Sequence, residues 1–198
     1  SAQASAPSDI LLSNLTFVTK GDIPLYFGPG VTRTTLTKST FLGLSNKTAI
    51  YLDAESALNV IEGNLFKLKT KYRELIAVDG SAKNRISDNV FENPVNGGIW
   101  LYRNCGEGGT IRHQKPQHNE IVANRFIYKS AFARPAIWLN HRDIGKFSCK
   151  MDPRYPFGSS LYYRDFARHN LVKGNRFEGP WSLRIVNFDY SNRIVGNR

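Results

Sequence analysis

The sequence predicts an all-β fold in which short parallel strands stack into a solenoid, and three observations carry this prediction. A phrase of the form N-x-[IV]-x-x-N-x-F occurs four times, at residues 59–66, 84–91, 119–126 and 170–177. A short apolar strand follows each copy. No stretch shows a long apolar face with the 3.6-residue period of a helix. A repeat of about 20 to 30 residues built from strands and turns is typical of a parallel β-solenoid.

The repeat places the same residue types at equivalent positions of successive coils. Its register can be followed through six phenylalanines: Phe17, Phe41, Phe66, Phe91, Phe126 and Phe177. Asparagines recur at two fixed offsets before the last four of these, and the first two copies are degraded, with Ser39 at one Asn position. Because coils of a solenoid stack at the strand spacing of about 4.8 Å, we expect the phenylalanines to fill the core. The asparagines are expected to form ladders that satisfy backbone groups in the turns.

The second strand of each coil alternates inward aliphatic residues with outward residues of other types. We align five such strands: 50–52, 76–78, 99–101, 137–139 and 183–185. In this alignment Tyr51, Trp100 and Trp138 share one outward column, and Arg184 follows them. A row of exposed aromatic rings is a surface on which sugar rings stack. The alternative is that Trp100 and Trp138 are covered by neighbouring loops and belong to a satellite apolar cluster.

The four phrases at 59–66, 84–91, 119–126 and 170–177 resemble those of the right-handed parallel β-helix proteins of the pectate-lyase-like superfamily. The predicted fold is therefore a right-handed parallel β-helix of about seven coils, forming a single domain over residues 10–198 after a flexible segment at residues 1–9. The last copy of the phrase, at 192–198, lacks its phenylalanine, and the sequence shows no segment that would cap the solenoid. We therefore expect the chain to be part of a longer β-helix.

The regular spacing is broken by two insertions, at 104–117 and at about 141–168, each placed after a second strand. Insertions at equivalent points of adjacent coils must lie side by side on one flank, and loops on a rigid scaffold concentrate binding and chemistry. All four histidines lie in or next to these insertions. Cys105 and Cys149 also lie there, and we expect them to form a disulfide, which is typical of an exported protein, secreted or periplasmic.

The formal net charge of +11 indicates an acidic partner, either an acidic polysaccharide, a nucleic acid or an anionic membrane surface. Residues 103–169 contain twelve Lys or Arg and five Asp or Glu, a local excess of seven positive charges. No motif that reads RNA or DNA is present, so an acidic polysaccharide is favoured over a nucleic acid. No apolar run reaches 18 residues, so no membrane-spanning helix is predicted. The oligomeric state is not indicated.

The insertions bring together the residue types needed for β-elimination or epimerisation of uronic acids. That chemistry needs a cation at the carboxylate, a base at C5 and, in a lyase, an acid at the leaving oxygen. The candidate catalytic residues are Arg103, Arg112 and Arg142 as cations, His113 and His141 as bases and Tyr102 as the acid. The candidate substrate-binding residues are Trp100, Trp138, Tyr51, Arg112, Lys115 and Asn140. The alternative is a solvated basic rim with loop histidines in structural roles.

Among enzymes, the order of strand, turn, phrase and strand is similar to that of the chondroitinase B-like lyases. The chain departs from that pattern at two points, because Asp79-Gly80 stands where the lyases have a basic lysine and Asn104 follows Arg103 where they have histidine. The D-P-H motif of related epimerases is also absent, since Arg154 replaces its histidine in "MDPR".

Asp53 and Asp79 occupy equivalent positions in neighbouring coils. Two carboxylates about 5 Å apart can hold a cation, for which calcium is the candidate, or serve a retaining hydrolase. They can equally end their strands and cap the following turns.

The sequence thus predicts an exported protein that binds or processes an anionic polysaccharide, as a lyase or epimerase if it is an enzyme. The alternative is a noncatalytic carbohydrate-binding or scaffold β-helix domain of a larger adhesin-like or tailspike-like protein.

Overall fold

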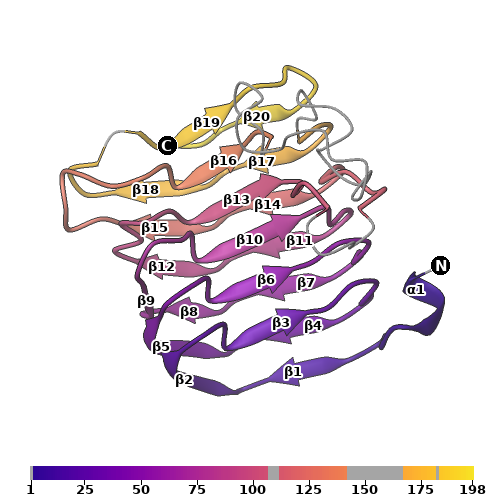
Figure 1. Cartoon of the computed structure of the whole chain (residues 1–198). Coiled ribbons are helices and arrows are strands. Elements are labelled where there is room, and N and C mark those ends of the chain that lie inside the picture. Colours follow the sequence, from indigo (N-terminus) through magenta and orange to yellow (C-terminus); the bar gives the residue numbers. More distant parts are fainter. Residues whose placement is uncertain (1, 107–111, 142–166, 182) are drawn as a thin grey trace.

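The chain forms a parallel β-helix in a computed structural model that describes residues 2–106, 112–141, 167–181 and 183–198. Figure 1 shows the coils stacked one above another, with the chain passing through three sheets in each coil. All strand pairings between the named strands are parallel. The predicted fold class is confirmed.

Sheet 1 contains the strands of the first half of each repeated phrase. Its order is β1 (Leu11–Ser13), β4 (Thr35–Thr37), β7 (Val60–Glu62), β11 (Arg85–Ser87), β14 (Glu120–Val122), β17 (Leu171–Lys173) and β20 (Arg193–Val195). The central residue of each of the five inner strands is buried in the core, in the register from Leu36 through Ile61, Ile86 and Ile121 to Val172. These seven strands agree with the prediction of about seven coils.

Sheet 2 contains the phenylalanines of the repeat. Its order is β18 (Arg176–Glu178), β15 (Arg125–Ile127), β12 (Val90–Glu92), β8 (Leu65–Phe66), β5 (Thr40–Ser45) and β2 (Thr16–Gly21), and β9 (Lys69–Thr70) pairs with the far end of β5. The six phenylalanine rings form one continuous stack, with centroid separations between 4.5 Å and 5.2 Å along it. Five of the six phenylalanines are buried in the core and Phe17 packs against it, which confirms the phenylalanine prediction.

Sheet 3 contains the second strands. Its order is β19 (Ile185–Asn187), β16 (Ile137–Leu139), β13 (Ile99–Tyr102), β10 (Ile76–Asp79), β6 (Ile50–Leu52) and β3 (Leu25–Phe27). The strand predicted at 183–185 was wrong by two residues, because Ile185 and not Leu183 pairs with Ile137. A shift of two residues keeps every side chain on the same face, so the alternating pattern could not distinguish the two registers. Val186, not Arg184, therefore follows Trp138 in the outward column.

Two asparagine ladders hold turns of the solenoid. One ladder lies in the turn between sheets 1 and 2, and the other lies in the turn before sheet 1. In each step, the side-chain oxygen of one Asn accepts hydrogen bonds from the backbone N–H and the side-chain amide of the Asn one coil earlier. The bonds from Asn64 to Asn89 measure 2.9 Å and 3.0 Å, and those from Asn89 to Asn124 measure 3.1 Å and 3.0 Å. Ser39 begins the ladder by donating its N–H to Asn64. The predicted ladders are confirmed.

The first turn of the chain is a short helix, α1 (Ala2–Ser5), which lies in the segment predicted to be flexible. Its Gln3 side chain donates a 2.8 Å hydrogen bond to the carbonyl of Glu55. No helix among the described residues is both long and apolar enough to cross a membrane.

Both insertions leave sheet 3 at the corner that leads back to sheet 1, on adjacent coils, because one follows β13 and the other follows β16. Their far ends meet again, since Gln117 and Arg168 form a parallel bridge. Arg142 and Cys149 lie outside the described residues, so the role of Arg142 and the disulfide between Cys105 and Cys149 stay predictions.

Candidate functional site

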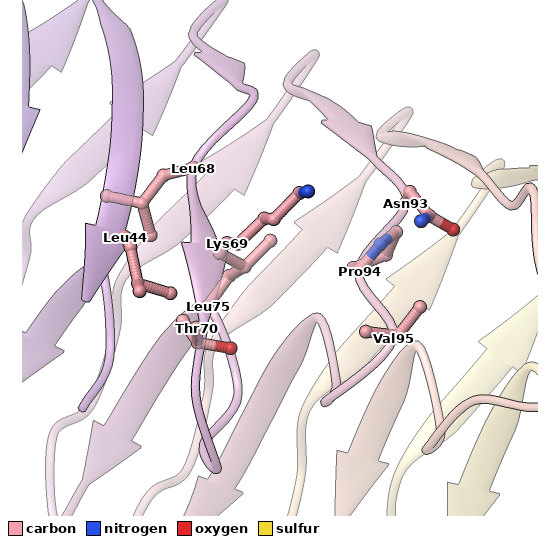
Figure 2. Close-up of a pocket in the computed structure, with 8 residues that line it drawn as sticks. All are labelled: Leu44, Leu68, Lys69, Thr70, Leu75, Asn93, Pro94 and Val95. Atoms are coloured by element: carbon pink, nitrogen blue, oxygen red, sulfur yellow. The ribbon is translucent and has the colours of Figure 1, made fainter. Parts of the chain in front are cut away.

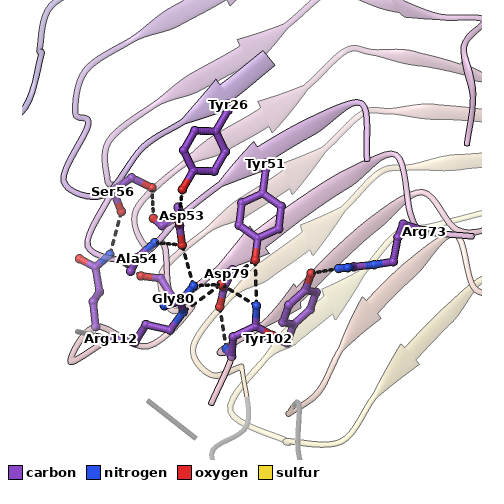
Figure 3. Close-up of polar contacts among 12 residues, drawn as sticks. Tyr26, Tyr51, Asp53, Ala54, Ser56, Arg73, Asp79, Gly80, Tyr102 and Arg112 are labelled. Carbon is purple, nitrogen blue, oxygen red and sulfur yellow. Dashed lines mark hydrogen bonds and ion pairs between the residues drawn. The ribbon is translucent and has the colours of Figure 1, made fainter. Parts of the chain in front are cut away.

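The side chain of Arg112 reaches back from the first insertion onto the outer face of sheet 3, where it lies between two aspartates (Figure 3). Asp79 is the last residue of β10, and Asp53 follows β6 at the equivalent position. One guanidinium nitrogen of Arg112 lies 2.9 Å from a carboxylate oxygen of each. All three side chains are nearly or fully buried. The insertion is thus fixed to the sheet by a buried network in which one guanidinium bridges two carboxyl groups.

Hydrogen bonds satisfy the remaining oxygens of the two carboxylates. Tyr51 donates its hydroxyl to Asp79 at 2.7 Å, and Tyr26 donates its hydroxyl to Asp53. The backbone and side chain of Asn104 donate to Asp79 at 2.6 Å and 3.0 Å. Dense pairing of this kind is what allows carboxylates to remain in a buried position.

The ionisation of these groups follows from burial and pairing. Burial raises the pKa of Asp79, and the nearby positive charge of Arg112 opposes that rise. Burial and the neighbouring Asp79 carboxylate both raise the pKa of Tyr51. Burial acts to lower the pKa of Arg112, but the attraction of Asp79 outweighs it, so the pKa of Arg112 is raised and the guanidinium stays charged. Tyr51 therefore remains a protonated donor across the range in which proteins function.

At Asp53 and Asp79, where a metal ion was predicted, the positive charge comes from the guanidinium of Arg112. Among the residues that the structure describes, no group of three or more His, Cys, Asp and Glu side chains is placed to hold a metal ion. This geometry gives calcium no support at the two aspartates.

Tyr102, the predicted acid, points into a second ion pair, between buried Glu74 and partly exposed Arg73. Its hydroxyl donates a 2.7 Å hydrogen bond to Glu74, which is fully buried, and it also accepts a hydrogen bond from Arg73. Arg73 contacts the Glu74 carboxylate at 2.9 Å. Burial and the charge of Glu74 raise the pKa of Tyr102 well above its usual value. The sequence analysis missed Glu74 and Arg73, because neither belongs to the repeated phrase nor to an insertion.

The side chain of Arg103 holds the first insertion by binding backbone carbonyls of that insertion. Its guanidinium donates to the carbonyls of Arg112 and His113 at 2.8 Å and 3.1 Å. Gly80, with φ of 59°, allows this close packing, because a Cβ there would lie 3.1 Å from the carbonyl oxygen of Gln114. Gln114 in turn donates to the carbonyls of Ser56 and Gly80.

The other predicted site residues are divided between the surface and the interior. His113 is exposed and Lys115 is half-buried, both in the first insertion. Asn140 and His141 are buried just after β16, where the Asn140 side chain accepts a 2.8 Å hydrogen bond from the His141 N–H. By register, Asn140 and His141 lie beside Tyr102 and Arg103 of the neighbouring coil. The structure therefore brings Tyr102, Arg103, Arg112, Asn140 and His141 to one corner, and all five are buried.

An aromatic column runs along the outer face of sheet 3, and we call it the aromatic face. It contains Tyr26, Tyr51, Trp100 and Trp138, with Ala77 between the tyrosines and the tryptophans. The tyrosine rings are 5.8 Å apart and the tryptophan rings 5.1 Å apart, centroid to centroid.

Hydrogen bonds hold three of the four rings of the aromatic face. The phenol groups of Tyr26 and Tyr51 bind the two aspartates, as described above, and the Trp100 indole donates a 2.9 Å hydrogen bond to the carbonyl of Pro135. The Trp100 ring lies over Gly97, where a Cβ would approach it to 2.7 Å. Tyr26 is half exposed, and Tyr51, Trp100 and Trp138 are half-buried.

Two histidines form a further stack at the turn before sheet 1. The rings of His118 and His169 are 5.5 Å apart and within 12° of parallel. Both residues have positive φ, at the same turn position of adjacent coils. Their stacking thus follows from the repeat.

Comparison with known proteins gives one family. A family model described as "Periplasmic copper-binding protein (NosD)" matches residues 31–141, which are 111 of the 198 residues. No curated protein and no solved structure matches the chain significantly. The resemblance to the pectate-lyase-like superfamily is not confirmed. The family's description places it in the periplasm, in agreement with the predicted secreted or periplasmic location. Since the match covers more than half of the chain, this protein belongs to the NosD family.

Proposed function

We propose that this protein is a noncatalytic β-helix that binds an anionic polysaccharide along its aromatic face. The observation that carries the proposal is the contrast between the buried ionisable groups and the partly exposed rings. Arg112, Arg103 and Tyr102, which lyase chemistry would use, are all buried: Arg112 and Arg103 hold the first insertion on sheet 3, and Tyr102 binds Glu74. A buried group that is already paired cannot contact a polymer without breaking those contacts.

The aromatic face suits a sugar chain running along the axis of the β-helix. Three of its four rings, those of Tyr26, Tyr51 and Trp100, are held by hydrogen bonds, so little side-chain entropy is lost when a ligand stacks on them. The two tyrosines and the two tryptophans each lie on adjacent coils, and Ala77 separates the pairs, so the face offers a polymer two aromatic platforms. The net charge of +11 favours an anionic polymer.

Copper, which the family description names, does not fit the described part of the chain. The two stacked imidazoles of His118 and His169 are parallel, so their in-plane lone pairs do not converge on one ion. No third His, Cys, Asp or Glu joins them in a group that could hold a metal within the described ranges. We therefore base the proposal on the aromatic face and not on a metal.

The substitution Trp138→Ala tests the proposal. We expect it to weaken binding of the polysaccharide about tenfold, because a stacked aromatic contact contributes about 0.5–1.5 kcal/mol beyond its buried area. Isothermal titration calorimetry with alginate, pectate, chondroitin, heparan and hyaluronan measures this, and Tyr190→Ala is the matched control, since Tyr190 is fully exposed and lies outside the aromatic face.

A second variant separates binding from folding. Tyr26→Phe keeps the ring but removes the hydroxyl that binds Asp53, so we expect a lower melting temperature and a loss of affinity much smaller than that of Trp138→Ala. Equal binding by wild type, Trp138→Ala and Tyr190→Ala would contradict the proposal.

A further inference from the structure

A basic and apolar surface lies at the corner between sheets 2 and 3, on a different corner from the insertions. Three loops of successive coils build it, over residues 67–75, 92–98 and 128–136. Side-chain hydrogen bonds join them, because Asn96 donates to the carbonyl of Thr70 at 2.7 Å and Arg134 donates to the carbonyl of Tyr72 at 2.9 Å. We call these three loops the basic corner.

The basic corner concentrates positive charge. The alternating sequence of residues 67–73, KLKTKYR, turns Leu68 and Thr70 inward and its lysines outward. Lys69, Lys71, Lys129 and Arg134 are exposed, and within the described ranges none of them forms an ion pair with a carboxylate. Two neighbouring cations do form ion pairs. Lys67 lies 3.8 Å from Glu92, and Arg73 pairs with Glu74.

Apolar side chains project from the same corner. Phe132, in the loop after β15, is 83% exposed. This loop reaches the left edge of the stack in Figure 1. The Ser130 hydroxyl accepts the Phe132 N–H and donates to the Phe132 carbonyl, a turn that holds the ring outward. Tyr72 is 62% exposed, and the Lys71 ammonium lies 5.2 Å from the centre of its ring.

A small apolar hollow lies beside these side chains (Figure 2). Its volume is about 260 Å³, and Leu44, Leu68, Leu75, Pro94 and Val95 line it together with Lys69. Figure 2 shows the Lys69 side chain extending across the hollow toward Asn93. An apolar recess with a cationic rim suits a ligand that carries both an acyl chain and an anionic headgroup.

We propose that the basic corner docks the protein on an anionic phospholipid surface. Phe132 and Tyr72 insert into the headgroup region, and Lys69, Lys71, Lys129 and Arg134 contact the lipid phosphates. Exposed aromatic side chains ringed by cations are the combination that binds such surfaces.

A lipid surface fits the corner better than a sugar polymer does. Hydroxyl groups need amide or carboxylate partners, but the side chain of Asn96 already binds Thr70 and that of Asn93 accepts the N–H of Lys129. Phe132 projects from a loop and is not part of a flat stacking platform. The docking site shares no residue with the aromatic face and does not depend on polysaccharide binding.

Vesicle sedimentation with the full chain tests this proposal. We expect binding to vesicles of phosphatidylcholine with about one third phosphatidylglycerol, and none to phosphatidylcholine alone. Each of Lys69→Ala and Lys71→Ala is expected to lower the partition coefficient about fivefold, from the roughly 1 kcal/mol that a basic residue contributes at an anionic surface. Phe132→Ser is expected to lower it at least tenfold.

Matched controls use the same residue types elsewhere. Lys173→Ala removes an exposed lysine of sheet 1, and Tyr190→Ser removes an exposed ring, and both are expected to bind as wild type. Equal binding to neutral vesicles would overturn the proposal. So would an unchanged partition coefficient for Phe132→Ser, or binding of soluble pectate that depends on Lys69 and Lys71 while vesicles are not bound.

Discussion

Arg112→Ala is expected to lower the free energy of unfolding by about 3–5 kcal/mol, because it leaves two buried carboxylates without their counter-charge. Arg112 lies 2.9 Å from both Asp53 and Asp79. Asp79 is fully buried, so solvent cannot replace the guanidinium as its partner. Urea denaturation measures the change. The matched control is Arg85→Ala, which removes an exposed guanidinium paired with Glu120 and should cost less than about 1 kcal/mol.

The loss caused by Arg112→Ala should depend on pH. Burial already raises the folded-state pKa of Asp79, and without Arg112 only the hydrogen bonds from Asn104 and Tyr51 oppose that rise. A carboxyl whose folded pKa exceeds its unfolded value contributes stability below the unfolded pKa, and this contribution is lost as the pH rises through the folded pKa. We therefore expect a smaller loss at about pH 5 than at about pH 8.

Two results would contradict this account of the ion network. One is a loss for Arg112→Ala no larger than that for Arg85→Ala. The other is a loss that grows on acidification. The double variant Asp79→Asn with Arg112→Met should recover part of the stability, because it removes a charge of each sign together.

Asn89→Ala is expected to lower the free energy of unfolding by about 3 kcal/mol. The Asn89 side chain accepts two hydrogen bonds from Asn64 and donates to the carbonyl of Ile61 and to Asn124. Truncation leaves several of these buried groups unpaired, and each costs about 1–3 kcal/mol.

Thermal and urea unfolding of Asn89→Ala can be compared with Asn46→Ala, which truncates an exposed asparagine of another turn. Similar stabilities of the two variants would mean that the ladders contribute little. Greater destabilisation of Asn89→Ala would show that the recurring asparagines hold adjacent coils together.

The sequence predicts the solenoid well because its geometry is repeated. An asparagine at a fixed offset from Phe66, Phe91, Phe126 and Phe177 reports the same turn each time, so the ladders and the ring stack could be derived from spacing. The same reasoning placed both insertions at one corner and Asp53 beside Asp79.

The direction of side chains inside the insertion could not be derived. Arg112 lies in a segment without a repeat, and its residue type suits a solvent-exposed ligand contact as well as a buried ion pair. Glu74 is likewise recognisable as a partner of Tyr102 only when two coils are placed side by side. The register of β19 was missed because a shift of two residues preserves the alternation of faces.

The most direct test of the central claim is an ultraviolet assay for unsaturated uronates with the wild-type protein. The panel is alginate, pectate, chondroitin, heparan and hyaluronan, each with and without calcium. Because Tyr102, Arg103 and Arg112 are buried and paired, we predict no rise in absorbance on any of them, together with measurable binding of at least one. A rise on any substrate would show that these residues reach a polymer after all, and would contradict the noncatalytic account.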